Sequence, residues 1–144
     1  MKKIVFNGQF LARKMTGQER FAIETILELD KLVNTEKIEL VVPKNSKNIP
    51  ELKNIKVKQY GKLTGILWEQ IDLAWYSIID HALTINLCSV MPILKPGVIC
   101  IHDLSYKVNP QYCKHLYGKL SQIWHKVFFA YRIYSIELFQ TAND

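Results

Sequence analysis

The stretch Gly97-Val98-Ile99-Cys100-Ile101-His102-Asp103-Leu104 decides the fold. Its apolar run, residues 98–101, follows Pro96-Gly97 and ends in a histidine and an aspartate. A short apolar run bounded in this way predicts a parallel strand that is buried on both faces of a sheet. Ligands of open parallel sheets bind outside the carboxyl ends of the strands, so His102 and Asp103 are candidate catalytic residues. The alternative interpretation is structural, with Asp103 capping a helix and His102 making a buried hydrogen bond.

Strand-like and helix-like stretches alternate along the rest of the chain. Apolar or alternating runs predict strands at residues 3–6, 38–43, 55–60, 83–90 and 98–101, with a further strand-like run at 132–136. Apolar residues at helical spacing predict helices at residues 17–33, 65–78 and 113–131. This alternation predicts an α/β fold with an open, mostly parallel sheet and helices on both faces. No repeat or interdomain linker is visible, so we expect residues 1–144 to form a single domain.

Three local patterns refine this prediction. Thr16 and Glu19 have the spacing of a capping box, which places the start of the first helix at Gly17. Alternation in residues 55–60 is typical of a half-exposed strand near a sheet edge. The second helix is predicted to bury a stripe made of Leu67, Trp68, Ile71, Ala74, Trp75 and Ile78.

Composition excludes several classes of protein. Hydrophobic residues make up 49% of the chain, enough for a core, yet no apolar run approaches the roughly 20 residues of a membrane span. Residues 1–6 read as a first strand and not as a signal peptide, so we expect a cytoplasmic protein. Cys88, Cys100 and Cys113 are expected to be free thiols. His81, His115 and His125 have no carboxylate or cysteine at ligand spacing, and we predict no metal site.

Positive charge is concentrated late in the chain. The formal net charge is +6, and no acidic residue occurs between Asp103 and Glu137. This segment contains Lys107, Lys114, Lys119, Lys126 and Arg132. Such a surface attracts phosphate, nucleic acid or anionic lipid, so a peripheral membrane contact through the basic helix around Lys114–Lys126 is one candidate. A solvated helix face without a partner is the equally favoured alternative.

The first loop between a strand and a helix is a candidate phosphate site. The free backbone amides of Gly17 and Gln18 begin the first helix, and a helix N-terminus can hold an anion. Arg13 precedes them in the same loop as a candidate phosphate contact. Gly8 and Gly17 are too far apart for the glycine pattern of a dinucleotide site. A plain helix cap beside a solvated basic loop explains these residues about as well.

Several segments together resemble a known family. They are Asn7-Gly-Gln-Phe-Leu11, Thr16-Gly-Gln-Glu-Arg-Phe21, Leu67-Trp-Glu-Gln70, Asn86-Leu-Cys88, Ile101-His-Asp-Leu-Ser-Tyr106 and Asn109-Pro110. In their order and spacing the chain is similar to the N-terminal domain of bacterial family 4 glycosyltransferases of the GT-B fold, the mannosyl- and rhamnosyltransferase-like group. The run 132–136 with Phe139 looks like a degraded form of a later strand of that family.

The resemblance implies a Rossmann-like domain on the acceptor side of a cleft. An enzyme of this family transfers a sugar, with retention, from a nucleotide-sugar co-substrate to a glycan or lipid-linked acceptor, without an obligatory metal. Carried over, Gly17 approaches the donor diphosphate. His102 lies beside the reacting sugar, with Asp103 next to it.

The chain departs from the family because it ends where the donor-binding half of the enzyme begins. We therefore expect a truncated or split glycosyltransferase, inactive alone, with a separate C-terminal half as a partner. A cleft with one wall cannot hold donor and acceptor in reacting geometry. The rival hypothesis is a non-catalytic basic module that binds a partner protein, a membrane surface or nucleic acid.

Overall fold

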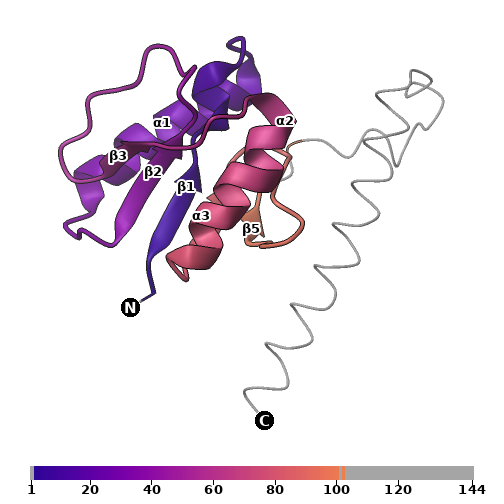
Figure 1. Ribbon diagram of the computed structural model, residues 1–144. Helices are drawn as coiled ribbons and strands as arrows, with labels where there is room; N and C mark the ends of the chain where they lie inside the picture. Colours follow the sequence, from indigo (N-terminus) through magenta and orange to yellow (C-terminus); the bar gives the residue numbers. More distant parts are fainter. Residues whose placement is uncertain (1, 101, 103–144) are drawn as a thin grey trace. The chain divides into compact units, whose positions relative to one another are not determined.

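The computed structural model describes residues 2–100 and 102 (Figure 1). The predicted site residue Asp103, the basic helix at 113–131 and the run at 132–136 lie outside the described residues. The described strands are β1 (Ile4–Asn7), β2 (Ile38–Val42), β3 (Lys56–Gln59), β4 (Leu83–Asn86) and β5 (Val98–Ile99). The helices are the 3₁₀ turn η1 (Gln9–Ala12), α1 (Gly17–Leu32), α2 (Gly65–Leu67), the π-helical turn η2 (Trp68–Leu73) and α3 (Ala74–Ile79).

The strands form one parallel sheet in the order β3-β2-β1-β4-β5. The predicted α/β class and the parallel sheet are therefore confirmed. The chain first moves from β1 outward to β3 and then returns to the other side of β1 with β4, so the direction of winding reverses between β1 and β4. In open parallel sheets this reversal opens a crevice at the carboxyl ends of the two strands.

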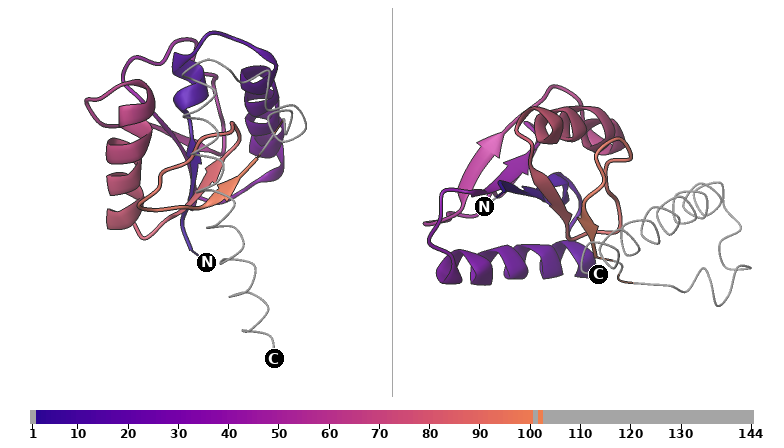
Figure 2. Two further views of the ribbon diagram at one scale, coloured as in Figure 1. Left: turned by 90° about the vertical axis from the view of Figure 1, so that its right-hand side faces the viewer. Right: turned by 90° about the horizontal axis from the view of Figure 1, so that it is seen from below.

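Two apolar layers cover the sheet, one on each face. Phe6 and Leu40 pack with Ile26 of α1, whereas Val5 and Val41 pack with Trp68 on the opposite face. Neighbouring strand residues point to opposite faces, so each helix layer receives alternate side chains of β1 and β2. Figure 2 shows α1 on one side of the sheet and the continuous helix α2–η2–α3 on the other. The prediction of helices on both faces is confirmed.

The helix α1 begins where the capping box predicts. The Glu19 carboxylate accepts a hydrogen bond from the Thr16 backbone N–H at 3.1 Å and another from the Thr16 hydroxyl. The helix runs over residues 17–32, close to the predicted 17–33. Glu19 is buried, so its carboxylate neutralises part of the positive end of the helix dipole.

The predicted buried stripe of the second helix is wrong at four of its six positions. Trp68 and Ala74 are buried, but Leu67, Ile71, Trp75 and Ile78 are exposed. The cause is the π-helical turn η2, which inserts one extra residue into the helix. In a regular helix Trp68 aligns with Trp75, seven residues later, whereas here it aligns with the buried Tyr76.

The prediction that residues 98–101 form a strand buried on both faces is also wrong. The strand β5 has two residues, lies at the edge of the described sheet, and leaves Val98 54% exposed. A Cβ atom on Gly97 would lie 2.0 Å from the Thr84 carbonyl oxygen, so the chain approaches β4 closely only because residue 97 is glycine. The opposite edge is β3, as the alternation in residues 55–60 predicted.

An ionic cluster fastens α3 to the amino-terminal end of the sheet. The Lys3 ammonium lies 2.8 Å from Glu39 of β2 and 2.6 Å from Asp80 at the end of α3. The hydroxyl of Tyr76 donates to Glu39. Burial favours neutral carboxyls, but the hydrogen bonds from Lys3 and Tyr76 outweigh it and hold the pKa of Glu39 below its usual range. The ionic cluster therefore stabilises the amino-terminal end of the sheet. The end at which ligands of open parallel sheets bind is the opposite, carboxyl-terminal one.

Candidate active site

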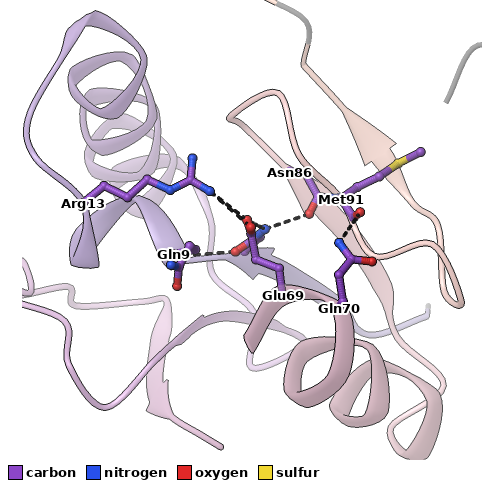
Figure 3. A network of polar contacts seen from close by, with 7 residues as sticks. Gln9, Arg13, Glu69, Gln70, Asn86 and Met91 are labelled. Atoms are coloured by element: carbon purple, nitrogen blue, oxygen red, sulfur yellow. Dashed lines mark hydrogen bonds and ion pairs between the residues drawn. The ribbon is translucent and has the colours of Figure 1, made fainter. Parts of the chain in front are cut away.

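A buried polar network lies where β1 and β4 end (Figure 3). Asn7 is the last residue of β1, and Asn86 is the last residue of β4. The Asn7 amide nitrogen donates to Asn86 Oδ1 at 3.0 Å and to Glu69 Oε1 at 2.9 Å. Its oxygen accepts from the Gln9 backbone N–H at 3.1 Å. The network therefore joins two neighbouring strands at the switch point of the sheet.

Glu69 reaches this network from the π-helical turn. Its side chain is 2% exposed, and it pairs with Arg13, whose Nη2 lies 3.1 Å from Oε2 and 3.3 Å from Oε1. Burial raises the pKa of Glu69, although Arg13 and Asn7 both favour its charged form. A carboxylate so deeply buried requires a charged partner, and Arg13 supplies it.

The next residue, Gln70, fixes the loop that follows β4. Its amide nitrogen donates to the Met91 carbonyl at 3.0 Å, and its amide oxygen accepts from the Ile93 backbone N–H at 3.0 Å. Glu69 and Gln70 are adjacent in sequence, yet one binds the loop after β1 and the other the loop after β4. π-helical turns occur often at functional sites, and this one positions two successive polar side chains at the crevice.

The predicted phosphate residues take up different positions. Gly17 has open space at its Cα, since a Cβ there would meet no neighbour within 4 Å. The Gln18 carbonyl accepts the weak S–H hydrogen bond of Cys88 at 3.8 Å. Burial raises the pKa of that thiol to about 11, so Cys88 is a neutral donor and not a nucleophile. Arg13 pairs with Glu69, a contact that the sequence did not indicate.

His102 is tied to the same region by two contacts. Its Nε2 lies 2.6 Å from the Leu87 carbonyl oxygen, and its ring meets the Phe21 ring edge to face at 4.9 Å. A carbonyl oxygen only accepts hydrogen bonds, so Nε2 carries the proton and Nδ1 holds a lone pair in the neutral ring. His102 is exposed, and its Nδ1 has no hydrogen-bond partner among the described residues. Asp103, the second predicted catalytic residue, lies outside the described residues.

Sequence reasoning missed most of the network. Asn7, Gln9, Glu69 and Asn86 were not predicted as site residues, although each lies in a segment quoted for the resemblance. The amide oxygen of Gln9 is buried and has no hydrogen-bond partner among the described residues. The available signal was the position of Asn7 and Asn86 directly after apolar runs, where parallel strands end.

Three further observations concern what was not found. Within residues 2–100 and 102, no group of histidine, cysteine or acidic side chains has the arrangement of a metal site. No helix of that region is long and apolar enough to cross a membrane. Searches against protein families, curated proteins and solved structures match nothing to the chain.

Proposed function

We propose that the chain is the acceptor-side domain of a sugar transferase that uses a nucleotide-sugar donor. The single supporting observation is that those segments of the resemblance that the structure describes meet at one place. Asn7 contacts Glu69 and Asn86, Gln18 contacts Cys88, and His102 contacts Phe21 and the carbonyl of Leu87. Segments that are up to 95 positions apart in sequence therefore converge near the carboxyl ends of β1 and β4.

The proposed roles follow from the chemistry of these groups. His102 accepts a hydrogen bond from a sugar hydroxyl through Nδ1, and Asp103 stands beside it in sequence. Gly17 and Gln18 line the approach of the donor phosphates, and Arg13 supplies the cation. The acceptor is a glycan or a lipid-linked glycan. The nucleotide-sugar donor is held by the donor-binding half that the resemblance implies, since transfer needs donor and acceptor held together.

A transfer assay tests the proposal. The full chain is incubated with a panel of labelled nucleotide-sugars and lipid-linked glycans, with and without a separately expressed donor-binding half. We expect no turnover by the chain alone, and turnover with the added half that His102→Ala reduces at least about 100-fold, by the loss of an interaction made at the reacting sugar. Turnover by the isolated chain would contradict the predicted inactivity. Failure to bind any glycan would overturn the acceptor role.

A second candidate function rests on the acid-free segment between Asp103 and Glu137. We propose that it binds anionic lipid, which also suits an enzyme acting on a lipid-linked acceptor. Replacing Lys114, Lys119 and Lys126 by glutamine is expected to weaken binding to phosphatidylserine vesicles about 100-fold, at about 1 kcal/mol per lysine. The matched control replaces the exposed loop lysines Lys44, Lys47 and Lys53. Equal losses in both triple variants would show a general charge effect and remove this candidate.

A further inference from the structure

Within residues 2–100 and 102, the guanidinium of Arg13 makes its hydrogen bonds through one nitrogen. Both of its contacts with Glu69 are made by Nη2, at 3.3 and 3.1 Å. Figure 3 shows the other terminal nitrogen pointing away from the carboxylate. A guanidinium carries five N–H donors, so Nε and Nη1 keep three of them without a partner in the part of the chain that the structure describes.

Arg13 is also the accessible member of its pair. Its side chain is 29% exposed, whereas that of Glu69 is 2% exposed. The carboxylate is therefore enclosed by the protein, whereas part of the Arg13 side chain is open to solvent. Two nearby groups add positive potential, namely the exposed Lys14 and the N-terminal amides of α1, while the buried Glu19 reduces it. The space beside Gly17 is open.

We propose that Glu69 is a positioning residue, which fixes Arg13 so that Nε and Nη1 donate a pair of hydrogen bonds to the oxygens of a diphosphate. A planar guanidinium matches two phosphate oxygens at once, and lysine does not. A side chain that is already held loses less rotamer freedom when the ligand arrives. The π-helical turn is part of this arrangement because it directs Glu69 toward Arg13 while the next residue holds the loop after β4. The inference rests on the proposed function, in which Arg13 contacts the donor phosphates. It adds that the ligand group is a diphosphate and that Glu69 acts by positioning Arg13.

The test exploits two opposite expectations for Glu69→Gln. If the carboxylate only neutralises Arg13, its removal makes the site more positive, and inorganic pyrophosphate binds more tightly. If the carboxylate positions Arg13, the same change releases the guanidinium, and pyrophosphate binds about tenfold more weakly, a loss typical of one charge-assisted hydrogen bond. Glutamine keeps the size of the side chain and the oxygen that accepts from Asn7, so the rest of the network is preserved.

The measurement is calorimetric titration of the full chain with pyrophosphate at constant ionic strength. Arg13→Lys keeps the positive charge and the ion pair but loses the planar set of N–H donors that can bind two phosphate oxygens at once. It is expected to weaken pyrophosphate binding about tenfold. Nuclear magnetic resonance of the Arg13 side chain reports whether the Nε signal of the unmodified chain shifts when pyrophosphate is added. This measurement tests the contact between Arg13 and pyrophosphate even if Glu69→Gln does not fold. Separate titrations with a nucleoside diphosphate and a prenyl diphosphate distinguish a nucleotide from a lipid source.

Three results would overturn the inference: no pyrophosphate binding by the unmodified chain, equal or tighter binding by Glu69→Gln, or unchanged binding by Arg13→Lys. None of them depends on sugar transfer. The chain could show the expected pyrophosphate binding and still fail every transfer assay, including those with the added donor-binding half. That result would overturn the proposed sugar transferase but leave the diphosphate site in place.

Discussion

Trp68→Ala is expected to lower the free energy of unfolding by about 3–5 kcal/mol, the range for truncating a large core aromatic. The Trp68 side chain is fully buried in the layer between the α2–η2–α3 helix and the sheet. Its indole N–H donates to the Tyr60 carbonyl at 2.8 Å, so the substitution also leaves that carbonyl without its partner. Urea unfolding followed by far-ultraviolet circular dichroism measures the change.

Trp75→Ala is the matched control, because Trp75 lies seven residues later on the same helix and is 59% exposed. We expect a change below about 0.5 kcal/mol, as for an exposed site without special contacts. The pair of variants tests the π-helical turn directly. A regular α-helix through this segment would align the two tryptophans and bury both. Comparable losses for the two variants would therefore contradict the inserted residue in η2.

The sequence was sufficient to predict the parts of the fold that depend on local patterns. Thr16 and Glu19 marked the start of α1 because a capping box is a contact between residues three positions apart. Alternation identified β3 as an edge strand because one of its faces meets solvent. The π-helical turn escaped prediction because apolar spacing is read against a regular helix, and the inserted residue depends on tertiary contacts of Glu69 and Gln70.

The candidate site was predicted only in outline. The strand-end rule pointed to the end of β5, whereas the buried polar network lies at the ends of β1 and β4. Glu69 looked like an ordinary acidic residue in the first turns of a helix. Its burial follows from Asn7 and Arg13, which are 62 and 56 positions away, and no local pattern encodes such contacts. Arg13 was predicted as a phosphate contact, and this stays a prediction, whereas its pairing with Glu69 was not predicted.

Asp30→Ala is expected to lower the free energy of unfolding by about 3 kcal/mol, through three buried or half-buried N–H groups left without an acceptor. Asp30 lies in the last turns of α1 and is 6% exposed. Its carboxylate accepts from the backbone N–H groups of Lys53, Asn54 and Ile55 at 2.7–2.8 Å, which ties the segment before β3 to α1. A negative charge near a helix C-terminus costs about 0.3–1 kcal/mol, less than these hydrogen bonds contribute.

The contribution of Asp30 is expected to depend on pH in one direction only. Burial alone would raise its pKa, but the three backbone hydrogen bonds outweigh burial and hold the pKa below its usual range. A carboxyl with a lowered pKa in the folded state stabilises the protein above its unfolded pKa of about 3.9, and this contribution is lost as the pH falls through the folded value. The stability difference between the unmodified chain and Asp30→Ala should thus be constant above about pH 5 and shrink below about pH 4.

Two further variants make this interpretation testable. Glu28→Ala removes an acid of the same helix whose ion pair with Lys31 is about two-thirds exposed, and should change stability by less than about 0.5 kcal/mol at every pH. Asp30→Asn keeps one oxygen, which can serve two of the three N–H groups, but turns its amide donor toward the third. The free energy of unfolding of Asp30→Asn at neutral pH should therefore lie between those of the unmodified chain and Asp30→Ala. The reason is that hydrogen-bond geometry, and not charge alone, holds this segment. A difference between the unmodified chain and Asp30→Ala that grows as the pH falls would reverse the assigned sign and exclude the carboxylate as the acceptor.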